Sequence, residues 1–215
     1  MSALLTLTDG QRAALAKLAC GVESPGGVAI LCGPPGTGKT TVLAHLADGQ
    51  SRAGRRCISR PLAAWDTDRG SDASLFDLFI VDDAHESDAE AIARLLAACR
   101  SRRADAAVVL AGEGRLLTLV SRDHHVEQAV GLRATLRPFS ALETRRLLEP
   151  ILPGAATRPE VAAVAQTIHE ISAGIPRAAL RLAELAAVVA DSRADAGLTV
   201  ADIELVHRRL SLQAA

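Results

Sequence analysis

The segment that most constrains this chain is a glycine-rich run, GPPGTGKT, at residues 33–40. It fits the pattern G-x-x-x-x-G-K-[ST]. Its glycines carry no Cβ, so the backbone can adopt unusual dihedral angles, and successive N–H groups can point inward around an anion. The run therefore predicts a loop that binds phosphate groups.

The side chains of this loop are the types that a bound triphosphate requires. We expect Lys39 to contact the β- and γ-phosphates and the hydroxyl of Thr40 to bind Mg²⁺. A helix that begins near Lys39 would direct its positive dipole end at the same phosphates. The residues expected to contact the nucleotide here are Gly33, Pro34, Pro35, Gly36, Thr37, Gly38, Lys39, Thr40 and Thr41.

The segments on either side of the loop support this interpretation. Residues 28–32 are apolar and partly β-branched, as in a buried parallel strand, and residues 39–48 have helical spacing. A strand, a glycine loop and a helix, in this order, are the context in which the motif binds phosphate.

The rest of the chain predicts an α/β fold with two parts. Further strands are expected at 56–60, 75–81, 106–111 and 133–136, and further helices at 9–20 and 88–101. These elements predict a three-layer αβα core with a parallel five-stranded sheet over residues 1–138. Capping signals, prolines and glycines then predict helices alone, at 140–148, 157–171, 176–190 and 199–210. Residues 139–215 are therefore expected to form a small helical lid.

Composition limits the classes of protein to consider. The 215 residues allow one α/β domain and a small appendage, and with only 2% aromatic residues the interior must be filled by Ala, Leu and Val. The net charge of −1 does not indicate a nucleic-acid partner. Four cysteines without paired spacing favour a reducing cytoplasm, and no signal sequence or membrane span is recognisable. We expect a cytoplasmic protein that does not insert into a membrane.

A second candidate for nucleotide chemistry is the acidic pair that follows the apolar run Phe79-Ile80-Val81. Acidic residues at the carboxyl end of a buried strand lie where doubly wound sheets bind their ligands. Asp82 is expected to hold Mg²⁺ through water, and Asp83 to orient or deprotonate the attacking water.

A third candidate lies at the start of the helix predicted at 176–190. Proline is common at the first helical position, and Pro176 fits that place. Arg177 does not, because a cation in the first turn opposes the helix dipole. A nucleotide phosphate beside Arg177 would resolve this conflict.

Together these segments resemble the AAA+ ATPases. The ordered set GPPGTGKT, FIVDDAH, VVLAGEGRLL, LRPFSALETRRLL and ISAGIPRAALRLAELA spans nearly the whole chain. It is most similar to the ATPase domain of general secretion pathway protein A (ExeA-like), and more distantly to the transposition-associated ATPases.

The resemblance implies roles for particular residues. Lys39 and Thr40 match the Walker A motif, and Asp82 and Asp83 match the Walker B pair, whose second acid is usually Glu. Glu113 lies near the sensor 1 position, and Arg177 matches the sensor 2 arginine of the lid. Because Asp83 is one methylene shorter than Glu, slow hydrolysis is expected.

The resemblance also implies partners. It implies a homo-oligomer, of which a hexameric ring is one form, in which an arginine of one subunit completes the neighbouring site. Arg133 and Arg122 are the candidates for that arginine. ATP or ADP with Mg²⁺ is the implied cofactor, and contact with a membrane would need another subunit.

The favoured function is an ATPase that drives oligomer assembly or the remodelling of a protein partner. An alternative is a switch or adaptor that binds ATP, hydrolyses it little and recruits a protein or DNA. A third interpretation is a helicase-like motor, because Leu7-Thr8-Asp9-Gly10-Gln11 before the loop resembles the start of superfamily 1 helicases. In those proteins such a glutamine reads adenine, which makes Gln11 a candidate nucleotide contact.

Overall fold

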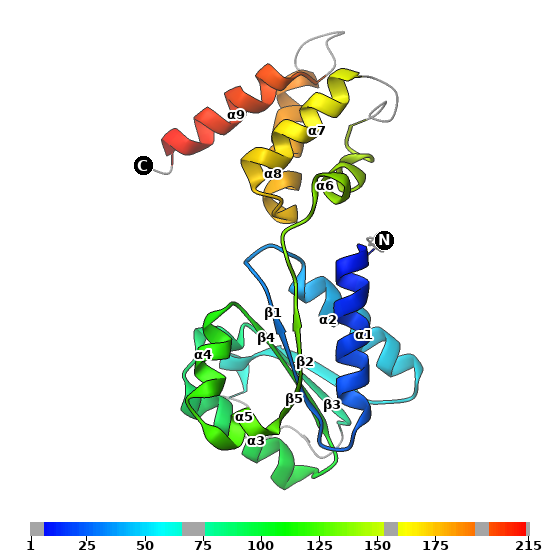
Figure 1. Ribbon diagram of the computed structural model, residues 1–215, viewed down its shortest axis with the longest axis vertical. Coiled ribbons are helices and arrows are strands. Elements are labelled where there is room, and N and C mark those ends of the chain that lie inside the picture. Colours follow the sequence, from blue (N-terminus) through cyan, green and yellow to red (C-terminus); the bar gives the residue numbers. More distant parts are fainter. Residues whose placement is uncertain (1–6, 66–75, 153–158, 192–197, 214–215) are drawn as a thin grey trace. The chain divides into compact units, whose positions relative to one another are not determined.

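The computed structural model describes residues 7–65, 76–152, 159–191 and 198–213. These residues form two compact units, Met1–Arg137 and Pro138–Ala215 (Figure 1). The placement of one unit relative to the other is not determined, so each unit is described by itself.

The first unit is built on a parallel sheet. Its strands are β1 (Val28–Cys32), β2 (Cys57–Pro61), β3 (Leu78–Asp82), β4 (Ala107–Gly112) and β5 (Val130–Thr135), in the spatial order β2-β3-β4-β1-β5. In this order β1 is paired on both sides, with Ile30 opposite Leu110 of β4 and Arg133 of β5. All neighbouring strands are parallel, so their carboxyl ends meet at one edge of the sheet.

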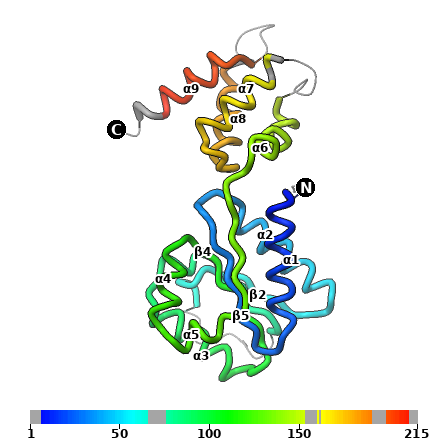
Figure 2. Tube along the Cα trace, in the orientation of Figure 1, coloured from blue at the N-terminus to red at the C-terminus, as the bar shows by residue number. Residues whose placement is uncertain are grey.

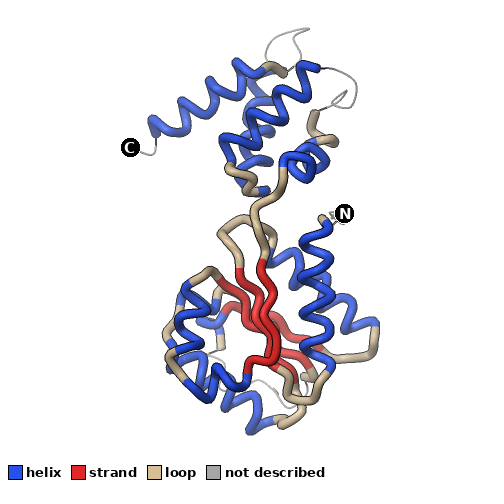
Figure 3. Tube along the Cα trace, viewed as in Figure 1, coloured by secondary structure: helices blue, strands red, loops and turns tan. Residues whose placement is uncertain are grey.

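Helices cover both faces of this sheet (Figure 3). Along β1, Val28 and Ile30 belong to one apolar cluster, and Ala29 and Leu31 to another, because successive side chains of a strand point to opposite faces. The cluster around Ala29 includes residues of α1 (Asp9–Glu23) and α2 (Lys39–Arg52). The opposite cluster includes residues of α3 (Ala89–Arg102), α4 (Arg115–Ser121) and α5 (His124–Ala129). The predicted αβα fold with a five-stranded parallel sheet is therefore confirmed.

The structure differs from the predicted elements mainly between residues 112 and 132. The helices α4 and α5 were not predicted there, because segments of 7 and 6 residues are too short to display a helical period. The adjacent histidines, His124 and His125, look like a surface loop in the sequence but lie in α5. Strand β5 begins at Val130, three residues before the predicted start, and β3 extends to include Asp82.

The second unit consists of helices (Figure 2). They are α6 (Ala141–Leu148), α7 (Pro159–Ser172), α8 (Pro176–Asp191) and α9 (Val200–Gln213). Their core contains Leu148, Ile168, Leu182 and Ile203, all nearly inaccessible to solvent. The capping box predicted at Ser140 is present, whereas the cap predicted at Thr157 lies outside the described residues. Within the described residues, no helix has both the length and the apolar character to cross a bilayer.

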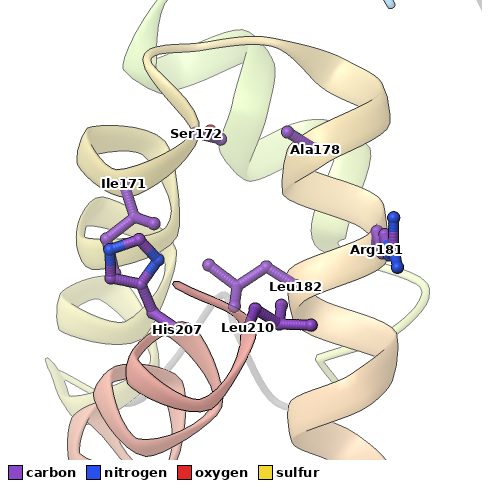
Figure 4. A pocket seen from close by; sticks show the side chains of 7 residues that line it. All are labelled: Ile171, Ser172, Ala178, Arg181, Leu182, His207 and Leu210. Atoms are coloured by element: carbon purple, nitrogen blue, oxygen red, sulfur yellow. The ribbon is translucent and has the colours of Figure 1, made fainter. Parts of the chain in front are cut away.

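The helical unit contains a cavity of about 480 Å³ (Figure 4). Its lining comes from α7, α8 and α9 and combines apolar side chains with one arginine and one histidine: Ile171, Ser172, Ala178, Arg181, Leu182, His207 and Leu210. None of these seven residues is among the predicted nucleotide contacts.

The turn between α7 and α8 predicts a glycine requirement. Gly174 has φ +69°, and an added Cβ would lie 2.3 Å from the carbonyl oxygen of Phe139. We expect Gly174→Ala to lower the free energy of unfolding by at least about 1–2 kcal/mol, the cost of the left-handed conformation alone. The measurement is urea unfolding followed by circular dichroism.

The matched control is Gly49→Ala. Gly49 lies inside α2, where a Cβ would meet no heavy atom within 4 Å. This change should stabilise the protein by roughly 0.5–1 kcal/mol, because glycine is a poor helix former. Equal effects of the two substitutions would contradict the geometry described for the turn.

Candidate functional site

The glycine-rich loop follows β1, an inner strand of the sheet, and ends in a helix. Its first residue continues the hydrogen bonding of β1, since the N–H of Gly33 donates to the carbonyl oxygen of Gly112 at 3.2 Å. Gly36 and Gly38 have φ +77° and +91°, a region that favours glycine. Helix α2 begins at Lys39, and the residue before it, Gly38, provides no side-chain cap. The first N–H groups of α2 are therefore not satisfied by a cap from this residue.

Lys39 lies against the start of the loop. Its side-chain nitrogen Nζ donates to the carbonyl oxygens of Gly33 at 2.9 Å and Pro34 at 3.1 Å. The residue is only 8% exposed. Two carbonyl contacts thus hold a cation within the loop, at the side chain that the motif assigns to phosphate.

The loop and the acidic strand tip meet at Thr40 and Asp82. The Thr40 hydroxyl donates to Oδ2 of Asp82 at 2.7 Å, although the two residues are 42 positions apart. The second oxygen of Asp82, Oδ1, accepts from the N–H of Asp83 at 3.0 Å. This contact joins the first turn of α2 to the carboxyl end of β3, and it brings together two residues that the sequence predicted for one metal.

Asp83 follows with a left-handed backbone, φ +51°, and precedes the short 3₁₀ helix η3 (Ala84–Glu86). Its carboxylate gathers with the side chains of His85 and Glu86, whose candidate ligand atoms all lie within 4.8 Å of one another. Asp83 is exposed, so its carboxylate is open to solvent beside the Asp82 contact.

His85 links this tip to the end of β4. Its Nε2 lies 3.5 Å from Oε1 of Glu113, and its carbonyl oxygen accepts from Arg115 at 2.8 Å. The ring nitrogen Nδ1 is buried and has no hydrogen-bond partner within the described residues. The side chain of Glu113, which the resemblance places near the sensor 1 position, is therefore a neighbour of His85.

Two further residues beside the loop have distinct surroundings. Burial raises the pKa of the Cys32 thiol, and the charges of Lys39 and Arg133 only partly offset this effect. Arg133 itself lies on β5, with its guanidinium 3.9 Å from a carboxylate oxygen of Glu127. Burial thus outweighs the two nearby positive charges at Cys32, the last residue before the loop.

Gln11 also reaches the loop, through its side-chain nitrogen, which donates to the carbonyl oxygen of Thr37 at 3.2 Å. Pro176 and Arg177 belong to the helical unit. Pro176 begins α8, as the sequence predicted, and Arg177 is exposed in its first turn. Its contact with a nucleotide phosphate stays a prediction.

Comparison with known proteins identifies the fold. Residues 6–65, which include the loop, match the family model described as an AAA domain. No curated protein sequence matches the chain significantly. Domain III of the replication initiation protein DnaA from Thermotoga maritima is 13% identical, with a TM-score of 0.69 over 94% of this chain and 93% of that one. The chain has the AAA+ fold.

Two other AAA+ neighbours show the same likeness. The Aeropyrum pernix ORC1 protein, solved in complex with DNA, is 18% identical, with a TM-score of 0.69 over 96% of this chain and 67% of that chain. The FIGL-1 AAA domain, solved in complex with ADP, is 16% identical, with a TM-score of 0.62 over 96% and 82%. The predicted resemblance to the AAA+ ATPases is confirmed, and the closer resemblance to general secretion pathway protein A stays a prediction.

Proposed function

We propose that this AAA+ protein is an ATPase that binds ATP with Mg²⁺ between the loop at 33–40 and the tip of β3. We further propose that binding and slow hydrolysis drive oligomer assembly or the remodelling of a protein partner. The observation that supports this most strongly is the 2.7 Å contact between Thr40 and Asp82. It places a hydroxyl and a carboxylate together, beside the loop that the motif assigns to phosphate.

The donor set fits Mg²⁺. This ion prefers oxygen ligands in octahedral geometry and is commonly held by one or two protein oxygens together with water and substrate phosphates. The Thr40 hydroxyl would bind the ion directly, and Asp82, whose Oδ2 accepts from that hydroxyl at 2.7 Å, would hold the ion through water. Bound here, the ion would neutralise charge on the β- and γ-phosphates.

The loop would supply the phosphate contacts. In our proposal Lys39 exchanges its bonds to the carbonyls of Gly33 and Pro34 for the β- and γ-phosphates. The backbone N–H groups of the loop and the N-terminus of α2 add a positive potential in the same direction. The ADP bound to the FIGL-1 AAA domain supports an adenine nucleotide as the ligand.

Asp83 would act on the attacking water. Its short side chain limits how far the carboxylate can reach, and a displacement of about 1 Å can lower a catalytic rate about a hundredfold. This favours slow hydrolysis and keeps open the alternative of an ATP-dependent switch or adaptor. Since ORC1 was solved with DNA, that alternative includes a DNA partner.

The remaining assignments follow from the family resemblance. Glu113 would sense the γ-phosphate from the end of β4, in contact with His85. Arg177 would read the same phosphate from the helical unit. Arg133 and Arg122 remain the candidates for the arginine that one subunit of an oligomer contributes to its neighbour.

The proposed coupling predicts nucleotide-dependent assembly. We expect the wild-type chain to form larger particles with Mg²⁺ and ATP than with ADP or without nucleotide, because the γ-phosphate completes the site between subunits. Size-exclusion chromatography with light scattering measures the mass directly. Lys39→Ala should remain at the nucleotide-free mass under every condition. An identical mass in all conditions for the wild type would contradict the coupling.

The short side chain of Asp83 predicts a slow rate of ATP hydrolysis. We expect the wild type to turn over more slowly than the enzyme median of about 10 per second. Asp83→Glu should accelerate steady-state phosphate release by roughly 10- to 100-fold if reach limits the rate. Asp83→Asn should abolish it.

Glu86→Gln is the matched control for these substitutions. It removes a carboxylate from the same cluster at a position with no proposed catalytic role. We expect its turnover to stay within about twofold of the wild type, a difference well under 1.4 kcal/mol in barrier height. A wild type as fast as Asp83→Glu would contradict the assignment.

A further inference from the structure

Gln11 takes part in two separate sets of contacts. In the first, it caps its own helix: its N–H donates to Oγ1 of Thr8 at 3.3 Å, and its Oε1 accepts from the N–H of Thr8 at 3.1 Å. This reciprocal pair is a capping box, in which glutamate serves as well as glutamine. The helix start therefore uses the oxygen of the Gln11 amide and has no need of its NH₂ group.

The NH₂ group is used by the glycine-rich loop. Nε2 donates to the carbonyl oxygen of Thr37 at 3.2 Å, in a contact that is buried on both sides, and Gln11 is only 7% exposed. Thr37 is itself fully buried, and its hydroxyl donates to the carbonyl oxygen of Pro34 at 2.8 Å. The start of α1 is thereby fastened to the loop by a bond that spans 26 residues.

Gly38 accommodates this contact closely. A Cβ on Gly38 would lie 2.5 Å from Nε2 of Gln11, and the backbone there has φ +91°. Both facts require glycine at this position: a Cβ would collide with the Gln11 side chain, and the backbone angle disfavours any other residue. The amide of Gln11 and the turn of the loop thus fit one another directly.

Planarity of the peptide bond gives the contact a consequence for phosphate binding. The C=O of Thr37 and the N–H of Gly38 belong to one trans peptide unit, in which they point in opposite directions. With the oxygen held by Gln11 on one side, the N–H of Gly38 is directed to the other side. That N–H is the last one of the loop before α2 begins at Lys39.

We propose that Gln11 is a positioning residue for the phosphate loop: it holds the Thr37–Gly38 peptide so that the Gly38 N–H points at the bound phosphates. This inference rests on the proposed function. It differs from the adenine-reading role that the resemblance to helicases suggested. The amide oxygen and one of the two N–H groups already have partners within the chain.

The decisive variant is Gln11→Glu. Glutamate keeps the size of the side chain and the capping box, but it replaces the donor to Thr37 with a carboxylate oxygen. The carbonyl of Thr37 then loses its buried partner and meets a like charge. We expect the dissociation constant for Mg²⁺–ATP to rise by about tenfold or more. Gln11→Met, which keeps the length without charge, should change it in the same direction.

The matched control is Thr8→Val, which removes the hydroxyl acceptor of the capping box and leaves the bond from Gln11 to Thr37. We expect it to lower the melting temperature while the dissociation constant stays within about twofold, well below the tenfold that 1.4 kcal/mol represents. Affinities are measured on the full chain by displacement of a fluorescent ATP analogue, with ATP and inorganic tripolyphosphate as competitors.

The two competitors separate loop positioning from recognition of the base. If Gln11 positions the loop, Gln11→Glu weakens ATP and tripolyphosphate by the same factor. A loss of affinity confined to ATP would overturn the inference and favour a contact with adenine. Equal losses of affinity in Gln11→Glu and Thr8→Val would also overturn it, because the capping box would then explain both. If the wild type binds neither competitor, the proposed function itself is overturned. If the wild type binds both and Gln11→Glu binds them with the same affinities, only the positioning role is overturned.

Discussion

The contact between the Thr40 hydroxyl and the Asp82 carboxylate depends on the parallel order of the sheet. The loop follows β1 and the acid ends β3, and β4 lies between these two strands. Because all the strands run in the same direction, both carboxyl ends lie at one edge. Helix α2 then begins there and presents Thr40 in its first turn. A reversal of either strand would place the lysine and the acid at opposite edges.

Burial of the sheet on both faces holds this edge in place. The strands β1, β3 and β4 are almost wholly inaccessible, and their side chains divide between two apolar clusters. Few aromatic residues are available. Among the described residues the largest fully buried side chain is that of Phe79, whose ring centroid lies 5.5 Å from that of Trp65. Otherwise the two clusters consist mainly of Leu, Val, Ile and Ala. The polar groups of the site are therefore confined to the strand ends and the loops that follow them.

The sequence was sufficient for the parts of the fold that have strong local signals. The glycine pattern placed the loop, the apolar run before Asp82 placed the strand tip, and Ser140 with Glu143 marked a helix start. It was insufficient where helices are too short to show a repeated apolar pattern, as in α4 and α5, which have 7 and 6 residues. It also could not give the order of the strands, which depends on packing between distant segments.

In the candidate site, too, some features could be predicted from the sequence and others could not. Lys39, Thr40 and Asp82 were predicted from motif spacing, and the contact that joins two of them follows from the topology. The pairing of His85 with Glu113 and the bond from Gln11 to Thr37 were not predictable, because both connect segments whose separation in the sequence carries no periodic signal. For Gln11 a motif suggested a nucleotide contact, which stays a prediction, and the structure adds a hydrogen bond from its side chain to the loop.

The central claim is that a triphosphate and its metal bind between the glycine loop and the tip of β3. Calorimetric titration with ATP, in the presence and absence of Mg²⁺, tests it most directly when the wild type is compared with Asp82→Asn. The account predicts that Mg²⁺ strengthens binding to the wild type and has little effect on the variant, while their metal-free affinities stay similar. An equal benefit from Mg²⁺ in both proteins, or no binding of ATP to the wild type, would contradict it.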